Sequence, residues 1–402
     1  MSKKISLGLA LAITFVSIAA AIAITMTTSM KIYNNLIKDL PGRSQMYAKL
    51  AEIDDLVRSE FYGKIDEEVL EDLLAQGYIA GTGDPFSRYM TADEYISYYN
   101  EIAGKMTGIG IRPSLDRDTG YILVQEVYGD SPAAAAGISK GDMITAIDGV
   151  KVEASNYREM VSKLEGDKLT SVSVTFIQSE TGQKLTANIS KGFTSRSVSY
   201  EKLGSIGYIR ITDFYKNTAS QFKDAVERLK SESVTGLIID VRNNSKGEIR
   251  YAAEVIDVLV PLATEGTGAI ATAINAAGEV IEVYSADSEN VNLPMVVLVN
   301  KYSEGGAELL ACDLRDYGKA QIVGETTGVK GTLQQVFRLD DGSAVLLTVA
   351  EIKPYISESF NGVGVTPDFP VELTLSNPED LWLLDREKDP QFQKAYEILT
   401  EE

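Results

Sequence analysis

The apolar residues at the start of the chain form one long run without a charge. The run extends from Ile5 to Met30, and its most apolar part, ISLGLALAITFVSIAAAIAIT, has the length of a helix that rises about 30 Å and crosses a membrane. Lys3 and Lys4 precede it, which favours an orientation with the rest of the chain outside the cytoplasm. We therefore expect an uncleaved membrane anchor in residues 1–31. A cleaved signal peptide is the alternative, but the run is long and no A-x-A site follows it.

Residues 32–104 show apolar positions at helical spacing. The stretch SQMYAKLAEIDDLVRSEF has such positions at Met46, Leu50, Ile53 and Val57. The following stretch, DEEVLEDLLAQGYIAG, continues the helical pattern, and we expect this helix to stop at Gly77. Thr91 precedes Glu94 by three residues, which is typical of a helix start. No catalytic motif occurs here, so a structural or oligomerising helical region is predicted.

The pattern changes to strands in residues 105–192. YILVQEVY alternates as a half-buried strand does, and SVSVTFIQ and QKLTANIS flank a hairpin turn at Ser179–Gly182. Between them, Tyr157, Met160, Val161 and Leu164 lie on one face of an expected helix. These features predict a compact β-rich module.

Short apolar strands alternate with helices in residues 193–376. GSIGYIRI, TGLIIDVR, MVVLVN and QIVGET are the strands, and helices are expected near 218–231, from Ile249 to about Val260, and over GGAELLACDLRDYG. This alternation predicts an α/β layer with parallel strand pairs. Residues 377–402 are expected to form a helical tail.

Composition narrows the chemistry. The chain has 402 residues, a net charge of −20 and no histidine, which excludes Ser–His–Asp and Cys–His catalysis and most zinc sites. The negative charge argues against nucleic acid as a partner. The one cysteine, Cys312, has no internal disulfide partner and lies in an apolar helical stretch, so a core side chain is favoured over a reactive thiol. We expect no metal or cofactor.

Four stretches in a common order resemble the carboxy-terminal processing peptidases, or tail-specific serine proteases. GDPFSRYMTADEY resembles that family's Gly-Asp-Pro-Tyr-Ser-Arg-Tyr-Leu segment, and GIGI with GDSPAAAAGISKGDMITAIDG resembles its PDZ domain. IDVRNNSKG is similar to Leu-Asp-Leu-Arg-Asn-Asn-Pro-Gly-Gly, and DYGKAQIVGETTGVKGTLQ with LDDGSAVLLTVAEI and GVGVTPDFPVEL resembles the catalytic end. The resemblance covers roughly residues 45–375. It implies a ClpP/crotonase-like α/β core with an inserted PDZ domain.

The resemblance also implies roles for single residues. The family's nucleophile is the third residue of a Ser-Ala-Ser-Ala-Ser-Glu run, which here reads SEGGAE and places Gly305 at that position. Lys330 matches the general-base lysine, and Gln334 matches the glutamine that orients it. The oxyanion region maps to Lys246, Gly247 and Gly306, and we expect Lys246, in place of a family glycine, to forbid the glycine φ angle and crowd the site.

Ser303 is the only serine near the degenerate position. As a substitute nucleophile it would lie two residues away, roughly 6–7 Å along an extended chain, so capping of the helix that begins near Gly305 is the favoured interpretation. Lys330 is itself open to two readings: a relic or surface charge, or a retained structural role.

The PDZ resemblance implies a groove for protein C-termini. Such domains add the peptide as a strand and bind its carboxylate with backbone N–H groups. These groups map to Gly108, Ile109 and Gly110, with Ile111 beginning the edge strand and Tyr157 lining the groove. The alternative is that these apolar residues form the module's own core, which is favoured for Met160 and Leu164.

Two functional hypotheses of different class follow. In the first, a membrane-anchored protein outside the cytoplasm binds polypeptide C-termini or unfolded exported proteins, and Gly305 leaves it catalytically impaired. In the second, an active serine endopeptidase cleaves exported proteins near their C-termini, using Ser303 with Lys330. Partners besides polypeptides are the membrane and, as an open question, further copies of the chain; nucleic acid is not expected.

Overall fold

The computed structural model describes Met26 and residues 40–105, 107–128, 131–166, 170–194, 196–261, 268–287 and 290–401. The chain divides into two compact units, Met1–Glu71 and Asp72–Glu402. The expected anchor, apart from Met26, lies outside the described residues. None of the helices in the described ranges combines the length and the apolar character needed to cross a membrane.

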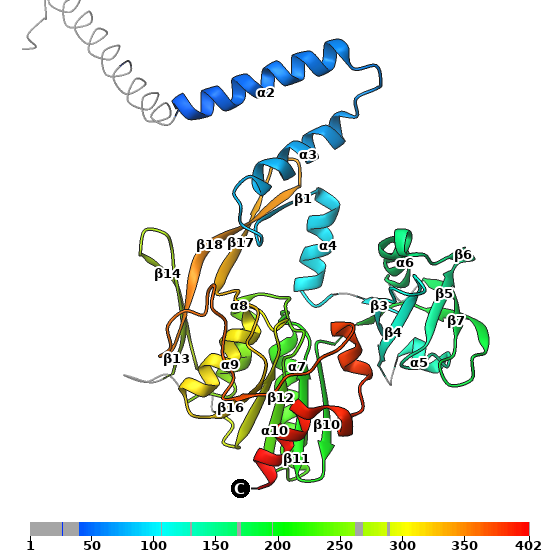
Figure 1. The fold of residues 1–402 in the computed structure, drawn as a ribbon, viewed down its shortest axis with the longest axis vertical. Coiled ribbons are helices and arrows are strands. Elements are labelled where there is room, and N and C mark those ends of the chain that lie inside the picture. Colours follow the sequence, from blue (N-terminus) through cyan, green and yellow to red (C-terminus); the bar gives the residue numbers. More distant parts are fainter. Residues whose placement is uncertain are drawn as a thin grey trace, which may run out of the picture. The chain divides into compact units, whose positions relative to one another are not determined.

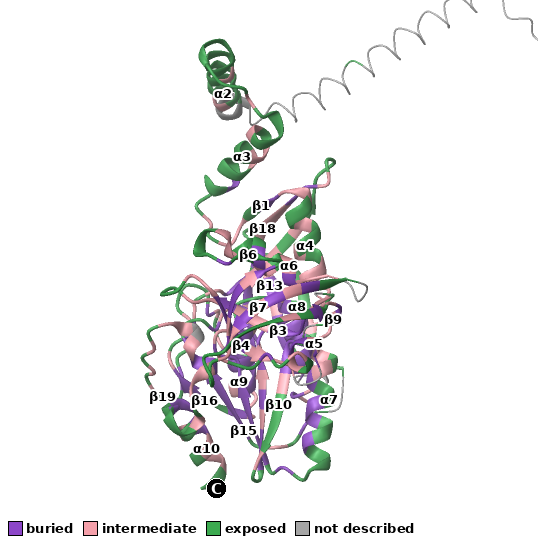
Figure 2. Ribbon diagram, turned by 90° about the vertical axis from the view of Figure 1, so that its right-hand side faces the viewer, coloured by how far each residue is buried: buried purple, intermediate pink, exposed green. Residues whose placement is uncertain are grey.

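The first unit contains α2 (Leu40–Glu60) and the start of α3 (Glu67–Ala80). Helical structure is confirmed for this region, but the expected stop at Gly77 is wrong, since α3 continues to Ala80. A glycine inside a helix costs only about 1 kcal/mol, which neighbouring helix formers offset. The apolar positions of α2 remain exposed, as Figure 2 shows in green; they include Leu50, Ile53, Leu56 and Val57.

A six-stranded sheet forms the centre of the second unit, in the order β10-β11-β12-β15-β16-β19. Its strands are β10 (Val198–Leu203), β11 (Ile206–Ile211), β12 (Gly236–Asp240), β15 (Met295–Val299), β16 (Ala320–Gly324) and β19 (Phe369–Pro370). All neighbours except β10 and β11 are parallel, as the alternation of strands and helices predicted.

Helices cover both faces of this sheet (Figure 1). They are α7 (Thr218–Ser231), α8 (Ile249–Asp257), α9 (Gly306–Asp316) and α10 (Pro390–Thr400), the last preceded by the 3₁₀ turns η2 (Pro378–Leu383) and η3 (Arg386–Lys388). Successive strand residues point to opposite faces: Leu237 and Ile239 pack in the cluster that holds α7, α8 and α9, whereas Ile238 packs with α10. Cys312 is buried in the first cluster, and burial raises the pKa of its thiol to about 11, which confirms a core side chain.

A second, five-stranded sheet lies over the ends of these helices. It is built from β1 (Arg88–Met90), β13 (Ala269–Ile274), β14 (Val280–Ser285), β17 (Thr332–Arg338) and β18 (Ala344–Pro354). β1 pairs with β18, and the Ser87 hydroxyl accepts a hydrogen bond from the Thr348 N–H at 3.0 Å. This pairing brings the segment before α4 (Ala92–Ile102) to the loop that carries Lys330. The expected helix start at Thr91 is confirmed by a reciprocal cap with Glu94.

The β-rich module has its own sheet, in the order β3-β4-β5-β7-β8 with β6 paired to β5. The elements are β3 (Ile111–Leu115), β4 (Ile122–Val127), α5 (Pro132–Ala135), β5 (Met143–Ile147), β6 (Val150–Lys151), η1 (Ala154–Asn156), α6 (Tyr157–Leu164), β7 (Ser171–Ile177) and β8 (Lys184–Ser190). The hairpin between β7 and β8 is confirmed. β2 (Thr107–Gly108) pairs with β9 (Phe193–Thr194), so the chain enters and leaves the module side by side.

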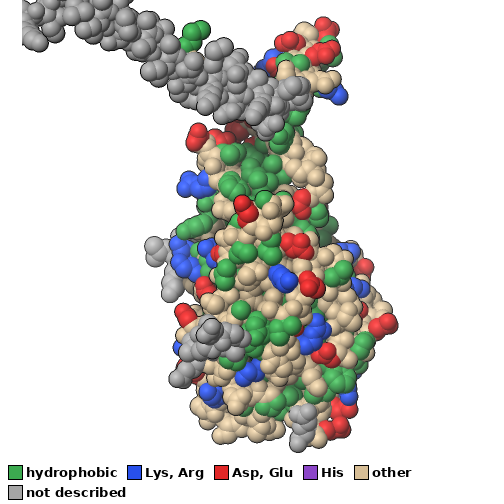
Figure 3. Space-filling view, turned by 90° about the vertical axis from the view of Figure 1, so that its left-hand side faces the viewer, with side chains coloured by type: hydrophobic (Ala, Val, Ile, Leu, Met, Phe, Trp, Pro, Cys, Tyr) green, Lys and Arg blue, Asp and Glu red, His purple; other side chains and the backbone are tan. Residues whose placement is uncertain are grey.

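Charged side chains of both signs are interspersed with hydrophobic ones on the face shown in Figure 3. The large hydrophobic clusters instead lie where helices pack against the sheets. The strands β12 and β15 are buried at every residue. The core therefore supplies a rigid frame on which the loops at the carboxyl ends of the strands are positioned.

Candidate active site and peptide groove

Gly305 lies at the sharp turn between β15 and α9. Its φ of +59° is in the left-handed region, which glycine adopts with little strain and other residues rarely do. Apart from its chain neighbours Glu304 and Gly306, the described atom nearest to a Cβ placed on Gly305 is Lys330 Cδ, at 3.9 Å. The turn therefore directs position 305 at the lysine side chain, but a glycine supplies no hydroxyl.

Lys330 projects into a cavity from the loop that precedes β17. Its Nζ lies 5.0 Å from the centroid of the Phe86 ring, within the range of a cation–π contact. Burial lowers the pKa of Lys330, while the carboxylate of Glu304 opposes this by raising it. Within the described part of the chain, the Nζ atom donates no hydrogen bond. An amine with a lowered pKa has the property that a general base requires.

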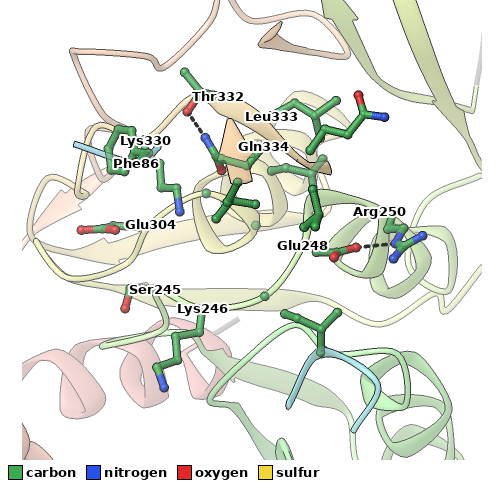
Figure 4. Close-up of a pocket in the computed structure, with 18 of the residues that line it drawn as sticks. Phe86, Ser245, Lys246, Glu248, Arg250, Glu304, Lys330, Thr332, Leu333 and Gln334 are labelled. Carbon is green, nitrogen blue, oxygen red and sulfur yellow. Dashed lines mark hydrogen bonds and ion pairs between the residues drawn. The ribbon is translucent and has the colours of Figure 1, made fainter. Parts of the chain in front are cut away.

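The cavity around these residues has a volume of about 780 Å³. Figure 4 shows Lys330 and Glu304 on one side of it and Ser245 and Lys246 on the loop opposite. Gly247, Gly305, Gly306 and Gln334 are among its further lining residues. The structure thus brings together in one cavity Ser245 and Gln334, which lie 89 positions apart in the sequence.

The carboxylate of Glu308 holds the two loops of the site together. Its Oε2 accepts hydrogen bonds from the N–H groups of Gly305 at 2.9 Å and Lys330 at 2.8 Å. Its Oε1 accepts from the Val329 N–H at 2.9 Å and the Thr327 hydroxyl at 2.6 Å. Burial raises the pKa of Glu308, whereas these donors lower it. One side chain therefore fixes both the nucleophile position and the lysine loop.

Two glycines of the oxyanion region are required by close packing. A Cβ on Gly247, whose φ is +107°, would lie 2.1 Å from the carbonyl oxygen of Phe214. A Cβ on Gly306 would lie 2.7 Å from Ala252 Cβ. The N–H groups of Gly247 and Gly306 donate to no group in the described residues, and both glycines line the cavity.

The expectation that Lys246 forbids a glycine φ angle is wrong, although Lys246 does line the cavity. The positive φ of this loop belongs to Gly247, and Lys246 is not among the residues with positive φ. Its side chain, 64% exposed, extends to Glu101, whose Oε1 lies 2.9 Å from Nζ. A lysine fits at position 246 because the positive φ angle falls one residue later, at Gly247.

Ser303 is neither exposed nor a helix cap. It is fully buried, its hydroxyl donates to the Val241 carbonyl at 2.8 Å and accepts from the Asn300 N–H at 3.0 Å. The cap residue of α9 is Gly305, and the Glu308 side chain bonds its N–H. The geometry therefore opposes both expectations for Ser303, because its oxygen is used by the turn itself.

Gln334 lines the cavity, and its hydrogen bonds within the described residues go to residues other than Lys330. Its Nε2 donates to the Thr332 hydroxyl at 2.7 Å and the Thr348 hydroxyl at 3.2 Å (Figure 4 shows the first). In the residues described, no hydrogen bond joins Gln334 to the lysine, so the orienting role that the resemblance implied is not present in this conformation.

The residues assigned to the peptide groove line a second cavity, of about 360 Å³. They are Gly108, Ile109, Gly110, Ile111 and Tyr157. β3, which begins at Ile111, is an edge strand of the module's sheet, as strand addition requires. The Ile109 N–H, however, already donates to the Leu164 carbonyl at 3.2 Å, and the Ile109 side chain is buried. Met160 and Leu164 are core residues, as expected.

The cavity and the groove share one wall. Glu101, Tyr215 and Lys246 line both. The Tyr215 hydroxyl donates to Glu101 Oε1 at 2.7 Å, the same oxygen that pairs with Lys246. Burial raises the pKa of Tyr215 well above its ordinary value, so the phenol remains a donor. A chain that passes from the groove to the cavity meets this charged wall.

Three residues of the site were not singled out from the sequence: Glu308, Glu304 and Phe86. The sequence did give one indication for Glu308, because this charged residue directly precedes the apolar stretch LLAC in an expected helix. A carboxylate in that position needs buried donors. Glu304 and Phe86 gave no such signal, because only the tertiary contacts place them beside Lys330.

Two family models match the chain, Peptidase family S41 at residues 205–371 and the PDZ domain at residues 107–189. The carboxy-terminal processing protease CtpA of Bacillus subtilis (strain 168) is 30% identical over 330 residues, which cover 81% of this chain and 69% of the relative. This chain belongs to the carboxy-terminal processing protease family. The resemblance found in the sequence is thereby confirmed.

Other relatives agree with this membership. A carboxyl-terminal-processing protease of Picosynechococcus sp. is 27% identical over 380 residues, covering 91% of this chain and 90% of that protein. Among solved structures, a Bacteroides fragilis protein assigned to the S41 proteases matches with a TM-score of 0.54 and 16% identity, covering 85% of this chain and 91% of that one. The latter likeness concerns the fold alone.

Proposed function

We propose that this member of the carboxy-terminal processing family binds the C-terminal tails of exported proteins and forms no acyl-enzyme. The observation that carries the proposal is Gly305, whose position faces Lys330 without a side-chain oxygen. A Ser–Lys peptidase needs an alcohol within hydrogen-bond reach of the amine, because the amine takes the proton of the alcohol. The alcohol oxygen then attacks the substrate and becomes acylated. The surrounding frame, with Glu308 and the glycines of the oxyanion region, supports retained binding of a peptide at the same place.

The PDZ groove is the proposed tail-binding element. Its support is the free edge of β3 beside α6 and the cavity that Tyr157 lines. Main-chain hydrogen bonds to an edge strand give affinity without a particular sequence, which suits a range of unfolded exported proteins.

For the N-terminal run we propose a membrane anchor that leaves both described units outside the cytoplasm. Whether copies of the chain associate is a separate question.

An active serine endopeptidase is the second candidate, and Ser303 is its only nearby alcohol in SEGGAE. Its hydroxyl is buried and bonded to Val241, which argues against it.

A fluorophosphonate probe separates the two candidates. The full chain, purified in mild detergent, is expected to remain unlabelled, because no activated alcohol faces Lys330. Gly305→Ser is expected to become labelled despite a backbone strain of about 1–2 kcal/mol, and Gly305→Ser with Lys330→Ala is expected to lose the label. Labelling of the unaltered chain at Ser303, identified by peptide mapping, would establish the second candidate.

Tail binding is tested with fluorescent peptides that end in a free carboxylate or in an amide. We expect the amide to bind at least about tenfold more weakly, because a lost charged hydrogen bond costs about 1.5–3 kcal/mol. Tyr157→Ala is expected to weaken binding of the free carboxylate, whereas the matched control Tyr200→Ala, on exposed β10, is not. Equal affinity of both peptides contradicts the proposal.

Anchoring is tested by alkaline extraction of membranes and by protease added to intact spheroplasts. The chain should stay with the membrane and be digested from outside. Release by alkali, or protection from external protease, contradicts the proposed localisation.

A further inference from the structure

Glu304 places a carboxylate beside Lys330 that the rest of the site does not use. Its side chain passes over Gly328, where a Cβ atom would lie 2.4 Å from Glu304 Cγ. The glycine at 328 is therefore what allows Glu304 to reach the cavity. Within the described residues, the Glu304 carboxylate takes part in no hydrogen bond and no ion pair closer than 4 Å. Figure 4 shows it on the same side of the cavity as Lys330.

The space beside this carboxylate is large enough for a small reactant. Apart from its chain neighbours Glu304 and Gly306, the described atom nearest to a Cβ placed on Gly305 is Lys330 Cδ at 3.9 Å, so beyond those neighbours position 305 opens to the cavity. Gly247 and Gly306 line the same cavity, and their N–H groups donate to no described group. Burial raises the pKa of Glu304, which the charge of Lys330 partly opposes, and a glutamate with a raised pKa is a better base near neutral pH.

We propose that Glu304 activates a water molecule in the space at Gly305, so that the cavity hydrolyses peptide bonds of unfolded polypeptides directly, without a covalent intermediate. This goes beyond tail binding, and it is compatible with the loss of serine chemistry. The lysine and the glycines of the oxyanion region correspond to parts of a Ser–Lys site, while water replaces the alcohol and the Glu304 carboxylate replaces the lysine as the base.

The steps balance within the site. The Glu304 carboxylate takes one proton from water, and the resulting hydroxide oxygen forms a bond to the scissile carbonyl carbon. The N–H groups of Gly247 and Gly306 bind the oxyanion of the tetrahedral intermediate. The C–N bond then breaks, the Lys330 ammonium donates a proton to the leaving amine, and the Glu304 proton returns to the lysine. The products are a carboxylic acid at the new chain end, which releases its proton to water, and a new amine.

Hydrolysis of quenched fluorescent casein by the full chain in mild detergent tests the proposal. Glu304→Gln keeps the size of the side chain and removes the base, so we expect turnover to fall about a hundredfold, within the usual contribution of general base catalysis. Glu227→Gln, on the exposed face of α7, is the matched control and is expected to leave turnover unchanged. Equal turnover in the unaltered chain and Glu304→Gln, including no turnover in either, overturns the proposal.

Folding of each variant is checked by its melting temperature. Should Glu304→Gln fail to fold, Glu304→Asp withdraws the carboxylate by one methylene and is expected to lower turnover about tenfold; an unchanged rate for Glu304→Asp would count against the proposal.

Two readouts distinguish this route from a serine route. Turnover should be insensitive to fluorophosphonate, and added hydroxylamine should yield no hydroxamate, because no acyl-enzyme forms. The rate should rise with pH as the Glu304 carboxyl group loses its proton, and Glu304→Gln should abolish this rise. Hydroxamate formation, or an identical acid limb in Glu304→Gln, would overturn the proposal. Tail binding is measured separately, so its failure is distinguishable from this one.

Discussion

The two ends of helix α9 bury acidic side chains in different ways. Glu308, at the N-terminal end, accepts four hydrogen bonds from the loops of the site. Asp313, nearer the C-terminal end, accepts one, from the Tyr355 N–H at 3.1 Å, and its Oδ2 has no partner in the described part of the chain. Burial raises the pKa of both, and that of Asp313 well above its ordinary value.

This difference teaches that burial alone does not indicate a functional carboxylate. Glu308 is surrounded by donors that belong to the loops of Gly305 and Lys330, and removing it leaves those donors unsatisfied. Burial favours the neutral form of Asp313, whose single donor in the described residues offsets little of the cost of its charge. Burial of the charged form is costly without partners, so such a group binds a proton instead.

The largest effect is expected for Glu308→Ala. The change leaves the N–H groups of Gly305, Val329 and Lys330 without their acceptor, and we expect a loss of about 3 kcal/mol or more in the free energy of unfolding. Urea denaturation followed by the fluorescence of Trp382 measures it. Glu358→Ala, on a side chain that is 92% exposed, is the control. A loss below about 1 kcal/mol would show that the four hydrogen bonds do not stabilise the loops.

A smaller loss is expected for Thr327→Val. The Thr327 hydroxyl donates to Glu308 at 2.6 Å and accepts from the Val365 N–H at 2.7 Å, so the isosteric valine removes two hydrogen bonds. We expect a loss of about 2 kcal/mol in the free energy of unfolding, measured by urea denaturation as for Glu308→Ala. The neighbouring Thr326→Val changes an exposed residue and should have little effect. Equal effects of the two variants would contradict the assigned role of Thr327.

Asp313→Asn should change the pH dependence of stability. Because the folded-state pKa of Asp313 is raised, wild-type stability is complete below the unfolded pKa of about 4 and declines as pH rises through the folded value. Asparagine does not ionise, so its stability does not fall in this way. The free energy of unfolding of the variant should therefore rise by about 1 kcal/mol relative to wild type as pH increases. Urea midpoints between pH 4 and 9 measure this. Parallel curves would show that Asp313 does not titrate abnormally.

The smallest change is expected for Lys246→Ala. Its ion pair with Glu101 joins a lysine side chain that is 64% exposed, and such pairs contribute at most about 0.5–1 kcal/mol. The free energy of unfolding should therefore change by less than about 0.5 kcal/mol, in contrast to Glu308→Ala. A larger loss would mean that the wall between cavity and groove stabilises the fold.

Much of the scaffold follows from local pattern. The strands and helices of the α/β core, the β7–β8 hairpin and the cap at Thr91 all depend on periodicity or on residues close in the sequence, and the structure confirms them. The family and its PDZ module were also recognisable, since motifs in a fixed order survive at low identity. The alignment of Gly305 with Lys330 came from that resemblance, and spacing alone did not indicate it.

The chain's sequence by itself determined that position 305 carries no alcohol, because side-chain chemistry is a local property. Only the tertiary structure decided what surrounds that position. It bonded the buried Ser303 hydroxyl to the Val241 carbonyl and gave the positive φ angle to Gly247, not to Lys246. It also placed Glu304 beside Lys330, over the glycine at 328. Each of these depends on contacts between segments distant in sequence, where close packing permits a glycine and excludes a side chain.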